Sequence, residues 1–300
     1  KNGPNAGTRV HDPEEVCLKN YIDDVICCAT SFDKYINLTE ELMLIFRKYN
    51  LRFSVEKSCW GMEEIKYLGF VVTGETWKPD PDRVKPLLEQ PIPTNLKELR
   101  GFLSSLAFYN RFLPFIASKL EPLCEKLRGL EKIQARKVKK PKGHINMEEA
   151  CIIAWRKAKE IIADEIVLWH IDPNKEFYIF VDSSDTASGS VILQYKGTDL
   201  RPVAFHSKVF TRAERNYNAS EREMLGVLHA LQKYRYILMG KGPRIYVYTD
   251  HRALVNVLRS RTEAKGRLER WRIVLSEYPS IIFKHIEGKK HGAADLLSRP

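Results

Sequence analysis

The 300-residue sequence lacks the patterns that assign a chain at once to a disulfide-rich, zinc-binding or membrane class. Its six cysteines include no C-x-x-C pair, and no cysteine and histidine cluster has zinc-finger spacing. No apolar run approaches the roughly 20 residues that span a bilayer, and the polar N-terminus has no signal-peptide core. We therefore expect reduced thiols and no membrane partner. The expected location is intracellular, either cytoplasmic or nuclear, and not secreted.

The sequence also begins without an initiator methionine, which indicates a fragment of a longer chain. Positive charge exceeds negative charge, with a formal net charge of +11. This excess favours polyanionic partners, nucleic acid first, although a merely basic surface explains the charge equally well. Hydrophobic residues make up 44% of the chain, enough for a sizeable core. The length itself indicates about two domains.

The first 78 residues show a hairpin pattern and a helical pattern. Residues 1–20 are predicted to be a leader, and its polar part is predicted to be disordered. The apolar stretch Val16–Ala29, which overlaps the end of the leader, predicts a strand, a tight turn and a second strand. Tyr35–Lys48 has helical periodicity, and Ile65–Thr73 predicts a further strand.

A helical region follows, after prolines that punctuate residues 79–93. Apolar periodicity predicts helices at Leu96–Tyr109, Arg111–Leu127 and Met147–Ala163. A basic run separates the second helix from the third. A solvated linker is the ordinary interpretation of such a run, and the alternative is a tether that grips phosphates. The nucleic-acid-binding candidates in this run are Lys137, Lys139, Lys140 and Lys142.

From Phe177 onward the pattern is that of an α/β fold. The predicted strands are Phe177–Asp182, Ser190–Tyr195, Pro202–Ser207, Ile245–Asp250 and Ile281–His285. The predicted helices are Glu221–Tyr236, Lys265–Ser276 and Gly292–Ser298.

Two of these strands are apolar throughout and then end in an aspartate, Asp182 or Asp250. Such strands are covered on both faces, and open α/β sheets place ligands at their carboxyl ends. If the strands are neighbours, the two carboxylates repel each other unless a cation lies between them. A pair of divalent ions would resolve the repulsion and support phosphodiester cleavage.

Each acid also has a bland alternative. An isolated aspartate is more often a turn or cap residue, and Asp185 competes with Asp182 for the role at the end of the first strand. Glu223 completes the pattern Ser220–Glu223, in which it could close a capping box. Its helical stripe nevertheless places it on a buried face, where an acid needs a partner. Asp295 could be an ordinary acid early in its helix.

Several short motifs lie in a consistent order in the second half of the chain. They are Phe205–Tyr217, Ser220–Glu223, Tyr248–His251, Arg270–Trp271 and Ala293–Arg299. Together they resemble the RNase H domain of gypsy-class long-terminal-repeat retrotransposons across roughly residues 173–300.

The resemblance implies an RNase H-like mixed sheet flanked by helices, within the α/β (α+β) class. It also implies hydrolysis of the RNA strand of an RNA–DNA hybrid with Mg²⁺ or Mn²⁺, as two ions. His285 stands where retroviral relatives carry a histidine proposed to aid water attack or product release, although a polar residue at a strand end is the simpler interpretation. Carried over by position, the metal-binding acids are Asp182, Glu223, Asp250 and Asp295.

The N-terminal part extends the resemblance to reverse transcriptase. Tyr21–Asp24 is similar to the YxDD turn of the polymerase palm, where two adjacent acids hold metals. The downstream motifs fit the palm and primer grip, and then the thumb or connection. These motifs are Leu51–Phe53, Lys57–Cys59, Tyr67–Phe70, Leu99–Leu103 and Tyr109–Phe112.

The fit is incomplete before the YxDD-like turn. Only 20 residues precede Tyr21, so the fingers, the front of the palm and a third polymerase acid have no candidates. Asp23 and Asp24 are therefore expected to be a polymerase remnant, inactive alone unless a longer precursor supplies the missing segments. The hairpin would also keep an unpaired edge.

The predicted organisation has five parts. They are a leader (1–20), a partial palm (21–78), thumb or connection helices (79–130), a basic tether and helix (131–172) and an RNase H-like domain (173–300). The leading functional hypothesis is an RNase H-type nuclease. The alternative is a catalytically inactive nucleic-acid-binding fragment of a decayed or domesticated element.

Overall fold

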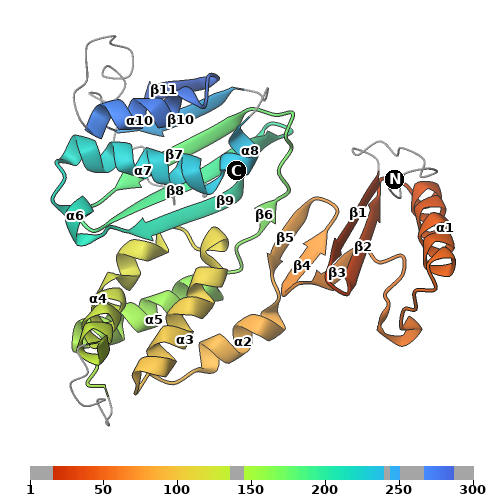
Figure 1. Ribbon diagram of the computed structural model, residues 1–300, viewed down its shortest axis with the longest axis horizontal. Coiled ribbons are helices and arrows are strands. Elements are labelled where there is room, and N and C mark those ends of the chain that lie inside the picture. Colours follow the sequence, from red (N-terminus) through yellow and green to blue (C-terminus); the bar gives the residue numbers. More distant parts are fainter. Residues whose placement is uncertain (1–15, 136–144, 240–243, 251–266, 287–300) are drawn as a thin grey trace. The chain divides into compact units, whose positions relative to one another are not determined.

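The computed structural model describes residues 16–135, 145–239, 244–250 and 267–286 (Figure 1). The chain forms two compact units, unit 1 over Lys1–Gly74 and unit 2 over Glu75–Pro300. Among the helices described, none is long and apolar enough to cross a membrane.

Unit 1 begins with the predicted hairpin. Strands β1 (Val16–Tyr21) and β2 (Asp24–Ala29) pair in antiparallel fashion, with Tyr21 opposite Asp24. Only Ile22 and Asp23 remain for the turn, so both acids of the motif lie at the hairpin tip. The predicted leader is wrong at its end, because residues 16–20 form most of β1.

The rest of unit 1 consists of a helix and a second hairpin. Helix α1 (Phe32–Lys48) starts earlier than predicted, because the Ser31 side chain caps it by accepting from the Lys34 N–H. A short 3₁₀ turn, η1, follows at Val55–Lys57. The stretch predicted as one strand is instead two, β3 (Glu64–Tyr67) and β4 (Phe70–Thr73), which pair in antiparallel fashion.

The second hairpin turns at Leu68 and Gly69, whose φ angles are 52° and 84°. Positive φ at both central residues is what a tight type I′ hairpin turn requires. Apolar periodicity carries no signal of this turn, which explains the incorrect prediction of one strand.

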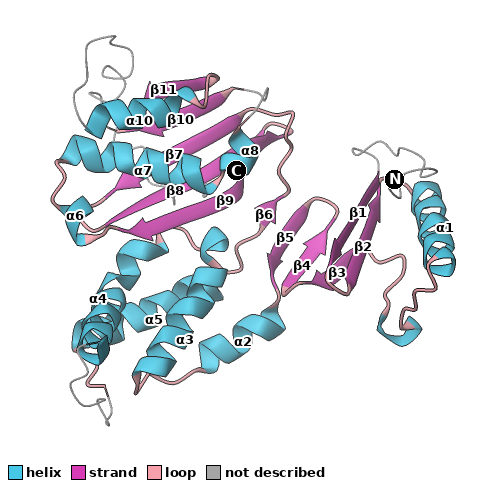
Figure 2. Cartoon of the chain, viewed as in Figure 1, coloured by secondary structure: helices cyan, strands magenta, loops and turns pink. Residues whose placement is uncertain are grey.

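Unit 2 opens with a helical layer between two short strands (Figure 2). Strand β5 pairs with β6 in antiparallel fashion, although some 90 residues separate them, and Thr76 lies opposite Trp169. The elements of this layer are β5 (Thr76–Pro79), α2 (Pro81–Glu89), α3 (Leu96–Phe108), η2 (Asn110–Phe112), α4 (Ile116–Ala135), α5 (Glu149–Ala163) and β6 (Leu168–Trp169).

Helix α5, predicted at Met147–Ala163 after the basic run, packs against the other helices of this layer. The Lys159 ammonium donates to the carbonyl oxygens of Leu88 (2.6 Å) and Gln90 (2.5 Å) at the C-terminal end of α2. A cation there satisfies carbonyls that have no partner within the helix and complements the helix dipole. Lys159 also lies over the Trp155 ring. The neighbouring residues 136–144 lie outside the described part of the chain.

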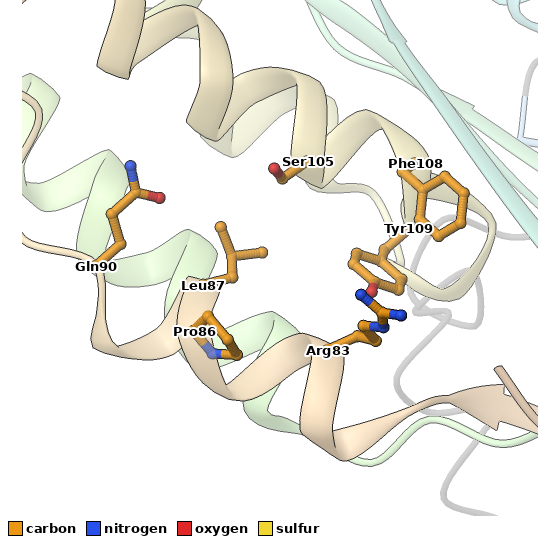
Figure 3. A pocket seen from close by; sticks show the side chains of 7 residues that line it. All are labelled: Arg83, Pro86, Leu87, Gln90, Ser105, Phe108 and Tyr109. Atoms are coloured by element: carbon orange, nitrogen blue, oxygen red, sulfur yellow. The ribbon is translucent and has the colours of Figure 1, made fainter. Parts of the chain in front are cut away.

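The segment between α2 and α4 differs in one respect from the sequence-based prediction, and it also contains a cavity. The helix predicted from Arg111 is wrong at its start, because the chain forms η2 and then turns at Phe115, whose φ is 49°. Helices α2 and α3 also line a cavity of about 340 Å³, into which Arg83, Leu87 and Ser105 project (Figure 3).

The rest of unit 2 is a five-stranded mixed sheet in the order β11-β10-β7-β8-β9. Strands β7, β8 and β9 are antiparallel neighbours, whereas β10 runs parallel to both β7 and β11. The predicted mixed sheet is therefore confirmed. The strands are β7 (Phe177–Ser183), β8 (Ala187–Lys196), β9 (Asp199–Val209), β10 (Ile245–Thr249) and β11 (Ile281–His285).

Helices cover both faces of the sheet. Helix α7 (Ala219–Lys233) packs on one face and α10 (Arg267–Ser276) lies beside it (Figure 1). Elements η2 and α4 contact the other face at β8 and β9. The short helices are α6 (Arg212–Arg215) and α8 (Arg235–Leu238). The core under α7 includes Phe177, Ile179, Val181, Met224, Val227, Leu231, Tyr234 and Val247.

Arg215 joins the sheet region to the helical layer. Its guanidinium donates to Glu121 at 3.0 Å and to Glu125 at 2.9 Å, both on α4. All three side chains are largely shielded from solvent, so this paired contact is stronger than an exposed ion pair.

Candidate active site

Asp182 and Asp250 lie at the ends of neighbouring parallel strands, so the condition under which their carboxylates crowd together is met. Phe180 of β7 pairs with Tyr248 of β10, and the same register continued by two residues places Asp182 opposite Asp250. Both side chains are exposed, and side chains two positions apart on a strand share a face. The carboxylates therefore lie together on the face of the sheet opposite α7.

Glu223 approaches the same point from the first half of α7. The capping box at this helix is formed by Asn218 and Glu221, so Glu223 does not have the capping role that the sequence left open. Its Oε1 instead accepts the backbone N–H of Ser183, the residue after Asp182, at 3.1 Å.

Gly226, one turn after Glu223, allows α7 to come this close. A Cβ at Gly226 would lie 2.4 Å from the Ser183 Oγ and 3.0 Å from the Val181 Cγ1. Any larger residue would force the helix away from β7 and withdraw Glu223 from the strand end. Sequence reasoning missed this position, because an isolated glycine in a helix has several explanations.

The environment of Glu223 disfavours a negative charge. The side chain is 7% exposed. Burial raises its pKa to about 8, and the charges of Asp250 and Asp182 add to the rise. Its Oε2 is buried and has no hydrogen-bond partner among the described residues.

An unpartnered buried oxygen beside two further carboxylates is the donor set that hard divalent cations take. Within the described residues, however, no three His, Cys, Asp or Glu side chains are already grouped closely enough to hold a metal ion. The residues therefore fit such a cation in chemistry, while the fourth predicted acid, Asp295, lies outside the described residues.

Asp185, the competing candidate, is placed differently. Its carboxylate lies 2.5 Å from the Arg222 guanidinium and is largely exposed. Arg222 also donates to the carbonyl oxygen of Tyr217, at 2.6 Å. Asp185 therefore helps to fasten the loop after β7 to α7 and is engaged with a cation of the chain itself.

His285 lies beside the backbone of Asp250, on the side away from Asp182. It pairs with Thr249 in the β10–β11 register, and its Nε2 is 3.0 Å from the Asp250 carbonyl oxygen. The structure therefore places the imidazole next to Asp250. The predicted binding residues Lys137, Lys139, Lys140 and Lys142 lie outside the described residues.

A buried polar cluster, which the sequence did not indicate, holds α7 against the sheet. His229 of α7 lies 3.0 Å from the Ser188 Oγ through Nδ1 and 3.0 Å from the Lys208 Nζ through Nε2. Burial and, to a smaller extent, the Lys208 charge together lower the pKa of His229 to about 4. Because the neutral imidazole has a partner at each nitrogen, it fixes both the rotation of α7 about its axis and its distance from the sheet.

An aromatic ladder continues from the two aspartates along the same face. Phe180 stacks on Tyr248 with ring centroids 4.6 Å apart, and Tyr178 stacks on Tyr246 at 5.2 Å. The Lys284 ammonium lies 4.3 Å from the centre of the Tyr246 ring. Phe180 is buried, whereas the three tyrosines are partly exposed. The Glu176 carboxylate accepts from the Tyr178 and Tyr246 hydroxyls. Partly exposed rings beside a cation are common in nucleic-acid grooves.

The second acidic pair, Asp23 and Asp24, is built much more simply. Both residues are exposed at the β1–β2 tip, next to Ile22, whose φ is 53° and whose side chain is 80% exposed. A β-branched residue in the left-handed region is strained, and such strain clusters at functional turns.

Known proteins resemble the chain both by sequence and by structure. Residues 172–278 match the model of the RNase H-like domain found in reverse transcriptase. Among curated relatives, the Pol polyprotein of transposon 297 from Drosophila melanogaster is 33% identical over 93% of this chain and 25% of its own length. The gypsy polyprotein of the same organism is 29% identical over 93% of this chain and 26% of its own length. The chain thus spans about a quarter of these relatives.

The solved structures agree on the fold. A foamy viral protease-reverse transcriptase in complex with an RNA/DNA hybrid covers 94% of this chain and 37% of its own, with a TM-score of 0.72 and 21% identity. A related foamy viral structure in complex with double-stranded DNA covers 90% of this chain and 46% of its own, with a TM-score of 0.71 and 20% identity. The predicted RNase H-like fold is confirmed.

Proposed function

We propose, on the premise that residues 172–278 belong to the RNase H-like domains found in reverse transcriptases, that this chain hydrolyses the RNA strand of an RNA–DNA hybrid. The observation that carries the proposal is the convergence of Asp182, Asp250 and the buried Glu223 at one strand end. Carboxylates gathered in this way are costly without a cation and suit phosphodiester hydrolysis with one.

The proposed metal ligands are Asp182, Glu223 and Asp250, together with Asp295. Mg²⁺ or Mn²⁺, as two ions, would supply an activated water and stabilise the leaving oxygen. The strands hold the two aspartates on rigid elements, which keeps their separation fixed. The Ser183 N–H orients Glu223, whose buried carboxyl group binds a proton at neutral pH until a cation is near.

The surroundings supply orientation and charge. His285, next to Asp250, is a candidate for exchanging protons with water at this end of the site. The aromatic ladder with Lys284 offers uncharged ring faces and one cation to a nucleic-acid strand. The hybrid bound in one of the solved relatives supports the choice of substrate.

The Asp23–Asp24 hairpin is proposed to be a polymerase remnant that does not act alone. Its two acids lie on a strained, exposed turn similar in sequence to the YxDD motif. We expect the 300-residue chain to hydrolyse hybrids and to leave a primer–template unextended with Mg²⁺ and deoxynucleotides.

The test is cleavage of an end-labelled RNA–DNA hybrid with Mg²⁺ and with EDTA. Wild-type chain should cut only the RNA strand, and only with the metal. Asp182→Asn should abolish cutting, while the matched variant Asp185→Asn, three residues away, should retain it. Robust activity of Asp182→Asn would reject the site.

The alternative of a binding module without chemistry is favoured by one observation. No three-residue metal group is preformed among the described residues. In that case the chain would bind hybrids with steep salt dependence and would show no metal-dependent cutting in the same assay.

A further inference from the structure

We propose that Phe115, which precedes α4 and lies outside the region matched to the RNase H-like family, is a positioning residue of the hydrolytic site. Its ring forms a side wall against which the scissile strand lies. The inference rests on the proposed function for the identity of that strand. Its geometry comes from the packing of the helical layer on the sheet.

A row of paired residues crosses the sheet from Asp182. Asp182 on β7 pairs with Gly189 on β8, and Gly189 pairs with Ser207 on β9. Residues paired across strands point to the same face, with Cα atoms about 4.5–5.5 Å apart. The space above Gly189 is therefore the space immediately beside the Asp182 carboxylate, on the side away from Asp250.

The Phe115 ring fills that space. A Cβ at Gly189 would lie 1.9 Å from the Phe115 Cδ1 and 2.5 Å from its Cε1, well inside van der Waals contact. Gly189 lies within a regular strand, so it is needed for room and not for an unusual backbone angle. The ring thus rests on the β8 backbone, one strand away from Asp182.

Contacts on both sides hold the ring in place. The Asn110 side chain donates to the Ser207 carbonyl oxygen at 3.2 Å, and the Ala117 N–H donates to the Ser207 Oγ at 3.1 Å. Between these anchors Phe115 has a φ of 49°, a left-handed conformation that is unfavourable for a bulky side chain. Such strain persists only where the surroundings enforce it.

The consequence is an asymmetric site. On the β10 side, Asp182 is bordered by Asp250, with His285 beyond it. On the β8 side, Asp182 is bordered by the uncharged, half-buried ring of Phe115. An aromatic face can pack against a sugar or a base without competing for a cation. The ring therefore limits how far the strand can shift sideways, and thus which phosphate reaches Asp182.

The main test variant is Phe115→Gly in the full chain. Glycine adopts a positive φ readily, so this change removes the ring while easing the backbone strain, and a cooperative thermal transition should remain. The matched control is Phe108→Ala, which removes an exposed phenylalanine of α3. On an end-labelled hybrid, Phe115→Gly should spread cutting over neighbouring phosphates and raise KM at least about threefold, and the control should do neither.

Gly189→Ala provides a second, independent variant. Its Cβ would displace the ring, so the cut sites should spread although Phe115 is still present. The double variant Phe115→Gly/Gly189→Ala removes the collision and should regain thermal stability. A purely structural role would restore the wild-type cut positions along with that stability, whereas a positioning role leaves the cuts spread.

A binding measurement without metal separates this inference from the hydrolase proposal. A hybrid carrying 5-iodouridine at successive RNA positions is irradiated with the chain in EDTA, and cross-linked peptides are identified by mass spectrometry. If wild-type chain cleaves, and Phe115→Gly cuts the same phosphates with unchanged KM, the wall is rejected and the hydrolase stands. If the wild-type chain does not cleave but cross-links at Phe115, the position of the ring beside the bound strand is upheld without hydrolysis. If it neither cleaves nor cross-links at Phe115, both the side wall and the hydrolase proposal are rejected.

Discussion

The two pairs of acids in this chain show how differently a carboxylate site can be supported. Asp182 and Asp250 are held by neighbouring strands above a core, with Glu223 brought in by a closely packed helix. Asp23 and Asp24 lie on a bare hairpin tip in unit 1. The difference teaches that how firmly two carboxylates are held depends on the packing beneath them.

The same contrast holds for the two units as wholes. The buried hydrophobic residues of the described part of unit 1 are Ile26, Leu38 and Val71, whereas unit 2 contains nearly all the others. Unit 1 also exposes large apolar side chains, including Phe32, Leu44 and Val55. The strands and helix of unit 1 form from residues close in sequence, but the hydrophobic core that unit 1 builds by itself is small.

The largest expected effect tests the contrast between the acid pairs. Asp250→Asn should lower the rate of hybrid hydrolysis at least about 100-fold, since even outer-shell partners of metal sites cost 10–100-fold when they are removed. The double variant Asp23→Asn/Asp24→Asn should change it less than about twofold. Single-turnover cleavage assays measure both rates. A large loss of hydrolysis in the hairpin variant would show that Asp23 and Asp24 contribute to the same reaction as Asp182 and Asp250.

The next effect concerns folding. Residues 75–300 expressed alone should give a cooperative unfolding transition, because unit 2 contains its own core. Residues 16–74 alone should show none, since so small a core cannot offset the conformational entropy of the chain. Circular dichroism during heating measures both fragments. A cooperative transition in the smaller fragment would show that unit 1 is self-sufficient.

Glu223→Gln should exchange activity for stability. The pKa of Glu223 is raised in the folded state, so the stability linked to its protonation is fully present below about pH 4.5 and is lost as the pH rises through about 8. A neutral glutamine avoids this loss and should stabilise metal-free chain at pH 8 by up to about 4 kcal/mol, while abolishing hydrolysis. Urea unfolding in EDTA tests this, with Glu221→Gln as a cap-weakening control.

Acid should destabilise unit 2 by the opposite linkage. Burial lowers the pKa values of His229 and His206 to about 4, so the unfolded chain binds more protons between about pH 6.5 and 4. The stability linked to the neutral imidazoles is present above pH 6.5 and is lost as the pH falls through about 4. We expect a loss on the order of 1–3 kcal/mol per histidine.

The measurement compares urea unfolding at pH 7.5 and pH 4.5. His229→Gln should show a shallower decrease than wild-type chain, because one of the two buried imidazoles is gone. An equal decrease in both proteins would show that folding does not lower the pKa of His229.

Much of the site could be predicted because it depends on short-range pattern. The apolar runs before Asp182 and Asp250 indicated buried strands, whereas their pairing as parallel neighbours, which the sequence left as a condition, comes from the structure. The stripe on α7 placed Glu223 on the buried face. The capping-box alternative arose because Asn218, the actual cap, lies two residues earlier than the serine that the pattern favoured.

The remaining features depend on contacts between distant parts of the chain. Strands β5 and β6 are short and pair across some 90 residues, so neither carries a recognisable period. The sequence predicted the α5 helix but not its packing partners, because the Lys159 contacts with the end of α2 join segments about 70 residues apart. The need for glycine at positions 189 and 226 is likewise visible only when both packing partners are in place.

The two contacts from Arg215 to Glu121 and Glu125 limit where the sequences of two related proteins can be joined to make a chimaera. A crossover near residue 172 would combine one parent's arginine with another parent's α4, and would separate Phe115 from the Gly189 that accommodates its ring. Chimaeras joined at that boundary should therefore tolerate little divergence, whereas crossovers near Gly74 keep every one of these partners in the same parental segment.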